Sequence, residues 1–87
     1  MNKEEFEEIM DGESHLENYR GKDTAFLGLC IISKYTPNKI ITAAGHDIIY
    51  SVQIDEILEA GLIKEDAIEL RNLNWMIADK DYLGCFV

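Results

Sequence analysis

The sequence predicts an α+β fold in which a small antiparallel sheet of about four strands, arranged as two hairpins, carries helices on one face. Two observations predict it. Apolar residues recur at helical spacing near the start of the chain and again after its middle, and two pairs of strand-like segments are each separated by turn residues. The length of 87 residues predicts a single domain, 1–87, with a thin core.

The first helix is expected close to the N-terminus. Phe6, Ile9 and Met10 recur at i, i+3 and i+4, while glutamates cover the other faces and suit a helix start. We expect this helix to end at Asp11-Gly12 and a further capped turn to follow over residues 14–19.

A nearly all-apolar segment, "TAFLGLCII", follows Asp23. Asp23 or Thr24 is a good N-cap, and Pro37 stops any helix before it. We expect a buried helix packed under the sheet. A strand is the alternative, because Ile31-Ile32 is β-branched and Gly28 weakens a helix.

Two hairpins supply the expected strands. "KIITAA" (39–44) and "HDIIYSV" (46–52) form the first, with Gly45 as a turn residue of positive φ. The segments 75–78 and 82–87, separated by "DKD", form the second.

Two short helices are expected between the hairpins. Gly61 ends the first, and Asn74 provides a left-handed C-cap for the second. The inward stripes are Ile54, Ile57, Leu58 and Leu62 in the first helix and Ala67, Ile68, Leu70 and Leu73 in the second. This helix–glycine–helix unit resembles a helix-turn-helix, but phosphates would repel its acidic second helix.

Charge is the most informative part of the composition. The chain has 17 acidic and 8 basic residues, for a net charge of −9. Residues 1–23 hold eight acids, residues 24–46 none and residues 47–87 nine. A basic stripe for nucleic acid is missing, and an anionic membrane would repel the chain, so neither is expected as a direct partner.

Catalytic and metal-binding chemistry has little support. Adjacent strand residues point to opposite faces, so a strand would separate the side chains of His46 and Asp47. The only other histidine is His15, and no spacing joins it to Asp47 or Asp55 as a metal set. We expect no enzyme activity, catalytic residue, cofactor or metal. A hydrolase or metalloenzyme built on the two histidines ranks last.

Both cysteines are expected to be buried, reduced thiols. Cys30 and Cys85 lie in apolar contexts without a CxxC motif. The longest apolar run is too short for a membrane span, and the N-terminus does not look like a signal peptide. A cytoplasmic location is therefore expected.

The second half of the chain resembles small phage and prophage proteins. The resemblance covers 46–87 and rests on "HDIIY", "EAGLIKEDAIEL", "LNW" and the terminal "CFV". Asn74 departs from the pattern, which has glycine before the tryptophan. The resemblance implies a host-takeover protein such as an anti-CRISPR inhibitor, which binds an effector complex and blocks its nucleic-acid channel or an assembly surface.

The acidic helices suggest a basic protein partner, because carboxylates on rigid elements can imitate a row of phosphates. The expected contacts are Glu4, Glu5, Glu8, Asp11, Glu56, Glu59, Glu65, Asp66 and Glu69. One alternative is a solvated surface without a partner. Another is a homodimer formed through exposed hairpin edges near Trp75, Tyr82 and Phe86.

Overall fold

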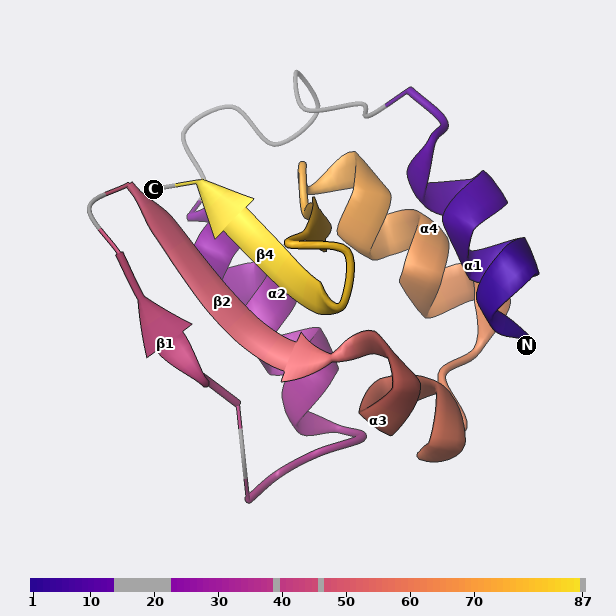
Figure 1. The fold of residues 1–87 in the computed structure, drawn as a ribbon, viewed down its shortest axis with the longest axis horizontal. Coiled ribbons are helices and arrows are strands. Elements are labelled where there is room, and N and C mark those ends of the chain that lie inside the picture. The colour runs from indigo at the N-terminus through magenta and orange to yellow at the C-terminus, as the bar shows by residue number, and fades with distance from the viewer. Residues whose placement is uncertain (14–22, 39, 46, 87) are drawn as a thin grey trace.

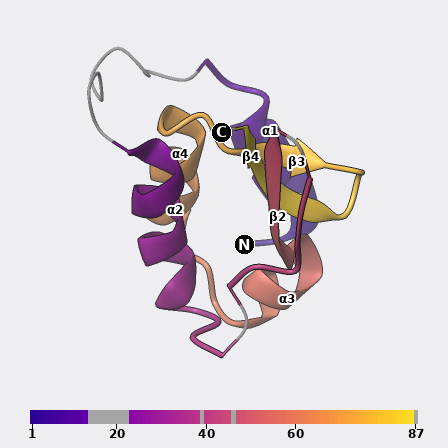
Figure 2. The same cartoon turned by 90° about the vertical axis from the view of Figure 1, so that its left-hand side faces the viewer.

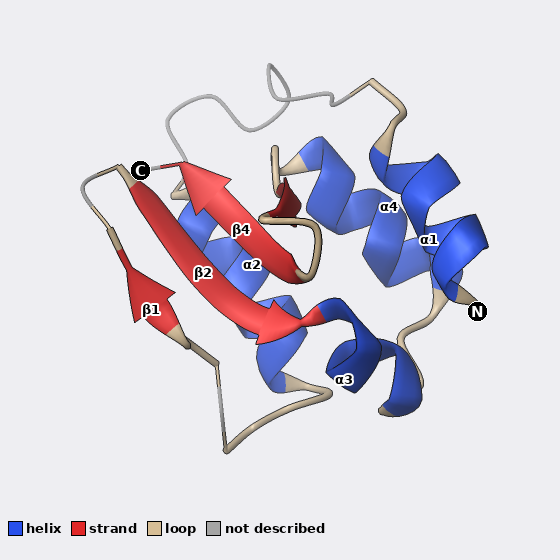
Figure 3. Ribbon diagram, viewed as in Figure 1, coloured by secondary structure: helices blue, strands red, loops and turns tan. Residues whose placement is uncertain are grey.

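The computed structural model describes residues 1–13, 23–38, 40–45 and 47–86 and confirms the α+β class (Figures 1 and 3). Within these residues four helices accompany a four-stranded antiparallel sheet. The elements are α1 (Lys3–Met10), α2 (Thr24–Ser33), β1 (Ala43–Ala44), β2 (Ile48–Gln53), α3 (Ile54–Glu59), α4 (Lys64–Asn72), β3 (Met76–Ala78) and β4 (Tyr82–Phe86).

The sheet has the order β1-β2-β4-β3, so two antiparallel hairpins are joined side by side through β2 and β4. The register pairs Ile49 with Cys85 and shifts between Tyr50 and Gln53. Figures 1 and 2 show α2 and α4 on one side of the sheet, with α1 and α3 beside it. The core therefore lies between the sheet and α2 and α4.

Helix α1 forms as its apolar spacing predicts. Phe6 is fully buried, and Ile9 and Met10 pack against the core. The side chain of Asn2 caps the helix by accepting a hydrogen bond from the Glu5 N–H (2.8 Å). The turn expected over residues 14–19 lies outside the described residues.

The segment after Asp23 is a helix, and Asp23 is its N-cap, accepting from the N–H of Phe26 (3.0 Å). The expectation that this helix is buried all round is wrong. Phe26 and Cys30 are exposed, because the neighbours of α2 cover only one side of it. The prediction of a buried thiol therefore fails at Cys30 and holds at Cys85.

Trp75 lies at the contact between α2 and the segment that joins α4 to β3. Its indole Nε1 donates to the carbonyl of Thr24 (3.1 Å), and only 2% of the residue is exposed. A Cβ added at Gly28 would fall on the indole ring, so the glycine makes this close approach possible. Trp75, which the sequence placed near the hairpin edges of a possible homodimer, is therefore part of the core.

The first hairpin is shorter than predicted. Strand β1 covers only Ala43–Ala44 of the expected 39–44, and position 39 lies outside the described residues. The carbonyl of Ile40 accepts a hydrogen bond from the buried hydroxyl of Ser51. This side-chain bond takes the place of a ladder bond, so regular pairing begins only at Ala43.

The turn of this hairpin also differs from the prediction. Gly45 does not have a positive φ, and its N–H donates to the carbonyl of Ile48 (2.8 Å). This bond places Gly45 before the central positions of the turn, which are the positions where a left-handed conformation would be needed. Strand β2 starts at Ile48, so Asp47 precedes it, and His46 lies outside the described residues.

Both predicted C-caps are confirmed. Gly61 has φ 97° and Asn74 has φ 67°. The N–H of Trp75 then bonds the carbonyl of Leu70 (3.0 Å), which is the Schellman arrangement. The two caps turn the chain sharply after α3 and after α4 and bring it back to the core.

Candidate protein-binding surface

Three acidic helices gather at one end of the molecule. Helix α1 contacts both α3 and α4, and Figure 1 shows the three together, with β1 and most of α2 toward the other end. Of the predicted contact residues, Glu4, Glu5, Glu8, Asp11, Glu59 and Glu65 are exposed, and Glu56, Asp66 and Glu69 are half-buried. We call the exposed set on α1, α3 and α4 the acidic surface.

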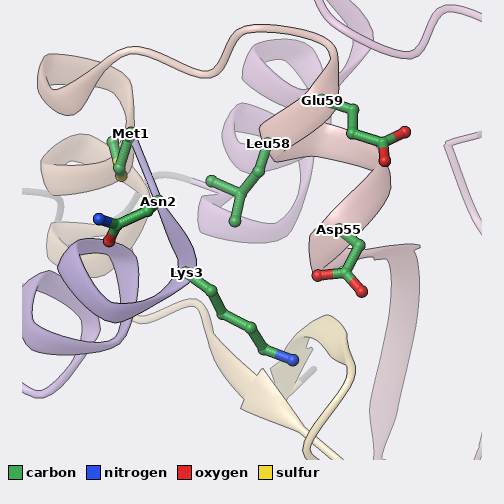
Figure 4. Close-up of a pocket in the computed structure, with 6 residues that line it drawn as sticks. All are labelled: Met1, Asn2, Lys3, Asp55, Leu58 and Glu59. Atoms are coloured by element: carbon green, nitrogen blue, oxygen red, sulfur yellow. The ribbon is translucent and has the colours of Figure 1, made fainter.

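An open pocket of about 290 Å³ lies where α1 begins beside α3 (Figure 4). Asp55 and Glu59, one helical turn apart on α3, line one wall, and Leu58 points between the walls. Met1, Asn2 and Lys3 form the opposite wall. The Lys3 ammonium lies 4.0 Å from Asp81 in the β3–β4 turn, and an ion pair this exposed contributes little to stability.

Asp66 has a role within the fold. Its Oδ2 accepts hydrogen bonds from the hydroxyl of Tyr35 and from Nζ of Lys34 (2.9 Å). The Tyr35 oxygen also accepts from the N–H of Ile63 (3.4 Å). Asp66 therefore holds the end of α2 against the start of α4. Sequence reasoning missed this triad because Lys34 and Asp66 are 32 positions apart.

The pKa values in this triad follow from its contacts. Burial alone raises the pKa of Asp66, but the hydrogen bonds from Tyr35 and Lys34 outweigh it and hold this pKa below its ordinary value. Burial and the bond to Asp66 raise the pKa of Tyr35. The bond to Asp66 likewise raises the pKa of Lys34. The triad therefore stays in its bonded ionisation state across the neutral range.

We expect Asp66→Asn to cost about 1–3 kcal/mol at pH 7, because a hydrogen-bonded carboxylate is lost. The folded pKa of Asp66 is lowered, so its stabilisation is present above the ordinary value of 3.8 and is lost as the pH falls through the folded value. The difference in free energy of unfolding between the parent and Asp66→Asn should therefore become smaller as the pH is lowered from 7 to 2, as measured by urea unfolding. Exposed Glu65→Gln is the control. A gap that stays constant with pH would contradict this role.

Arg71 provides a second connection that the sequence did not reveal. Its Nη1 donates to the carbonyl of Ile9 at the end of α1 (3.4 Å), and its Nη2 donates to Oδ1 of Asn72 (3.3 Å). A cation at the C-terminal end of α1 also complements the helix dipole. Arg71 therefore joins α1 to α4 and fixes part of the acidic surface in place.

No metal centre is assembled within the described part of the chain, where no three His, Cys, Asp or Glu side chains are placed to hold an ion. The two histidines considered for such a site, His15 and His46, lie outside that part. Burial raises the pKa of the Cys85 thiol, which opposes the reactive thiolate form. Among the described helices, none has the length and apolar composition to cross a bilayer.

No family model, curated protein or solved structure matches this chain. The function is therefore inferred from the geometry and charge of the acidic surface.

Proposed function

We propose that this protein is a binding module whose acidic surface docks on a basic, nucleic-acid-binding surface of a partner protein. The resemblance of residues 46–87 to phage and prophage proteins implies the class, a phage-encoded inhibitor of the anti-CRISPR kind acting in the host cytoplasm. The observation that carries the proposal is the segregation of charge. Residues 1–13 and residues 54–72 each hold six acids, against one and two bases, whereas residues 24–45 hold no acid.

The fold brings together the helices that carry these acids, because α1 contacts both α3 and α4. Phe6 and Arg71 fix α1 against its neighbours, so Glu4 and Glu8, one turn apart, keep a constant spacing. A surface with fixed carboxylates attracts a basic partner over long range and orients it on approach. Helical backbone positions that are already ordered also reduce the conformational entropy that is lost on binding.

The pocket beside α3 offers a specific contact within this surface. Asp55 and Glu59 carry carboxylates on the same helical face, and Leu58 supplies an apolar floor between them and Lys3. An arginine suits such a site, because its guanidinium pairs with carboxylates while its stem packs on apolar atoms. We therefore expect a partner arginine to enter this pocket.

The test is competition with target DNA for purified CRISPR effector complexes, followed by gel shift. Adding the protein first should abolish DNA binding by a susceptible complex. Glu8→Gln combined with Glu59→Gln should weaken this inhibition at least tenfold. The matched control, Asn38→Lys with Thr42→Lys, changes the net charge by the same two units at exposed sites in the acid-free segment.

The control variant should inhibit as the parent does. Equal losses in the two variants would indicate that total charge, rather than the acidic surface, drives binding. Undiminished inhibition by the Glu8 and Glu59 variant would contradict the proposed surface.

A further inference from the structure

Lys3 is a basic residue at the edge of the acidic surface. It is the only base among residues 1–13, and it is the first residue of α1. The positive end of the helix dipole disfavours a cation at this position. Its side chain lines the pocket opposite Asp55 and Glu59, which we call the pocket carboxylates (Figure 4). What this lysine contributes therefore depends on its neighbours around the pocket.

The ammonium of Lys3 is paired with a carboxylate that does not line the pocket. Its Nζ lies 4.0 Å from Oδ1 of Asp81 in the β3–β4 turn. Within the described part of the chain, Lys3 forms no ion pair with either pocket carboxylate, although all three side chains line the same pocket. Asp81 therefore holds the ammonium to one side and leaves the pocket carboxylates to an incoming cation.

The backbone on both sides of this ion pair is fixed. The carbonyl of Asp81 accepts a hydrogen bond from the N–H of Ile54 (2.8 Å), the first residue of α3, so the β3–β4 turn is held beside the pocket wall. The backbone of Lys3 is held by the start of α1, which the side chain of Asn2 caps. An exchange of partners by Lys3 therefore requires only side-chain rotation.

The ion pair is weak enough for such an exchange. The side chains of Lys3 and Asp81 are 43% and 67% exposed, and a pair this open contributes little free energy. Lysine also carries its charge on a flexible stem of four carbons, so the ammonium can turn between neighbouring carboxylates. Lys3 is thus tethered beside two sets of acceptors, Asp81 on one side and the pocket carboxylates on the other.

We propose that Lys3 is a built-in competitor for the partner arginine, and that Asp81 is a positioning residue that keeps the pocket open. In the open arrangement Lys3 pairs with Asp81. In the closed arrangement Lys3 pairs with the pocket carboxylates and takes the place of the guanidinium. The affinity for arginine then depends on the fraction of molecules in the open arrangement. This inference rests on the arginine pocket of the function proposed above.

A double-mutant cycle on the labelled full chain tests this competition. The probe is N-acetyl-arginine amide at constant ionic strength, and the NMR signals of the Leu58 and Glu59 amides report its binding. Lys3→Gln should tighten binding about threefold and Asp81→Asn should weaken it about threefold, as the small free energy of an exposed ion pair allows. In the Lys3→Gln background, Asp81→Asn should lose most of its effect, because no competitor remains to be released.

Two residues of the β3–β4 turn provide matched controls. Asp79 and Lys80 are exposed and do not line the pocket. Lys80→Gln removes the same charge as Lys3→Gln, and Asp79→Asn removes the same charge as Asp81→Asn. Each control should leave the dissociation constant of the probe within about 1.5-fold of the parent value, because salt screens exposed charges outside the pocket.

Three results would overturn the proposal. Weaker binding to Lys3→Gln would make Lys3 a supporting contact instead of a competitor. An equal loss from Asp81→Asn in both backgrounds would show that Asp81 acts through its charge alone. An absence of saturable shifts at Leu58 and Glu59, in the parent and in Lys3→Gln, would show that arginine does not use this pocket.

Failure of the proposed function is seen in a different measurement. The gel shift with effector complexes contains no probe, and the probe titration contains no effector complex. A protein that binds the probe as expected but does not inhibit the complexes retains the competition by Lys3 and loses the proposed function. Inhibition without probe binding would keep the acidic surface and remove the arginine pocket.

Discussion

Replacing Trp75 by alanine is expected to lower the free energy of unfolding by about 3–5 kcal/mol. The indole is buried against Gly28 and donates to the carbonyl of Thr24, so the change leaves a cavity and removes a hydrogen bond. A domain of this size has a total stability of roughly 4–13 kcal/mol, so the loss is a large part of it. Urea unfolding should be followed by circular dichroism, because Trp75 is the sole tryptophan and the variant has no tryptophan fluorescence to record.

The Gly28→Ala variant provides the matched test of the same contact. In the parent it should cost about 1–3 kcal/mol, because the new methyl group meets the indole. In the Trp75→Ala background this cost should largely disappear, giving a strong coupling in a double-mutant cycle. Additive effects of the two substitutions would contradict the close approach.

Replacing Phe6 by alanine is expected to cost about 3–5 kcal/mol and to release α1 from the rest of the fold. The helix has eight residues, too few to persist alone in water, and Phe6 is its fully buried side chain. Amide hydrogen exchange should therefore lose protection in α1 before β2. Because α1 carries Glu4 and Glu8, partner binding through the acidic surface should weaken as well.

Glu7→Ala is the control for this experiment, since Glu7 is exposed in the same helical turn. The free energy of unfolding of Glu7→Ala, and the protection free energies of its α1 amides, should stay within about 0.5 kcal/mol of the parent values. Unchanged protection of the α1 amides in Phe6→Ala would show that other contacts hold the helix.

Local chemistry accounts for the parts of the fold that the sequence predicted well. Asp23, Gly61 and Asn74 each satisfy a helix end through their own side chain or backbone conformation, so their roles can be read one segment at a time. The length of β1 could not be predicted from its local sequence in this way. It depends on the hydroxyl of Ser51 reaching the carbonyl of Ile40, a contact made only in the folded chain.

The candidate binding surface likewise combines features that the local sequence predicts with features that only the folded chain reveals. The acidic residues of α1, α3 and α4 are visible as a charge pattern, but the sequence does not distinguish exposed Glu65 from Asp66, which bonds Tyr35 and Lys34. The face of the sheet on which each strand residue lies could be assigned only from the pairing of β2 with β4. Only the register places Tyr50 beside Gly84, although the period-two spacing of Tyr82, Gly84 and Phe86 gave a partial signal.

The pairing of β2 with β4 also governs how the chain reaches its native state. Each hairpin closes over a short stretch, and such closures take microseconds. The contact between Ile49 and Cys85 instead closes a long loop that contains α3 and α4. The slow folding step should therefore be the pairing of β2 with β4 after each hairpin has formed. The caps at Gly61 and Asn74 reverse the chain after α3 and after α4, which keeps the two hairpins close together and shortens this step.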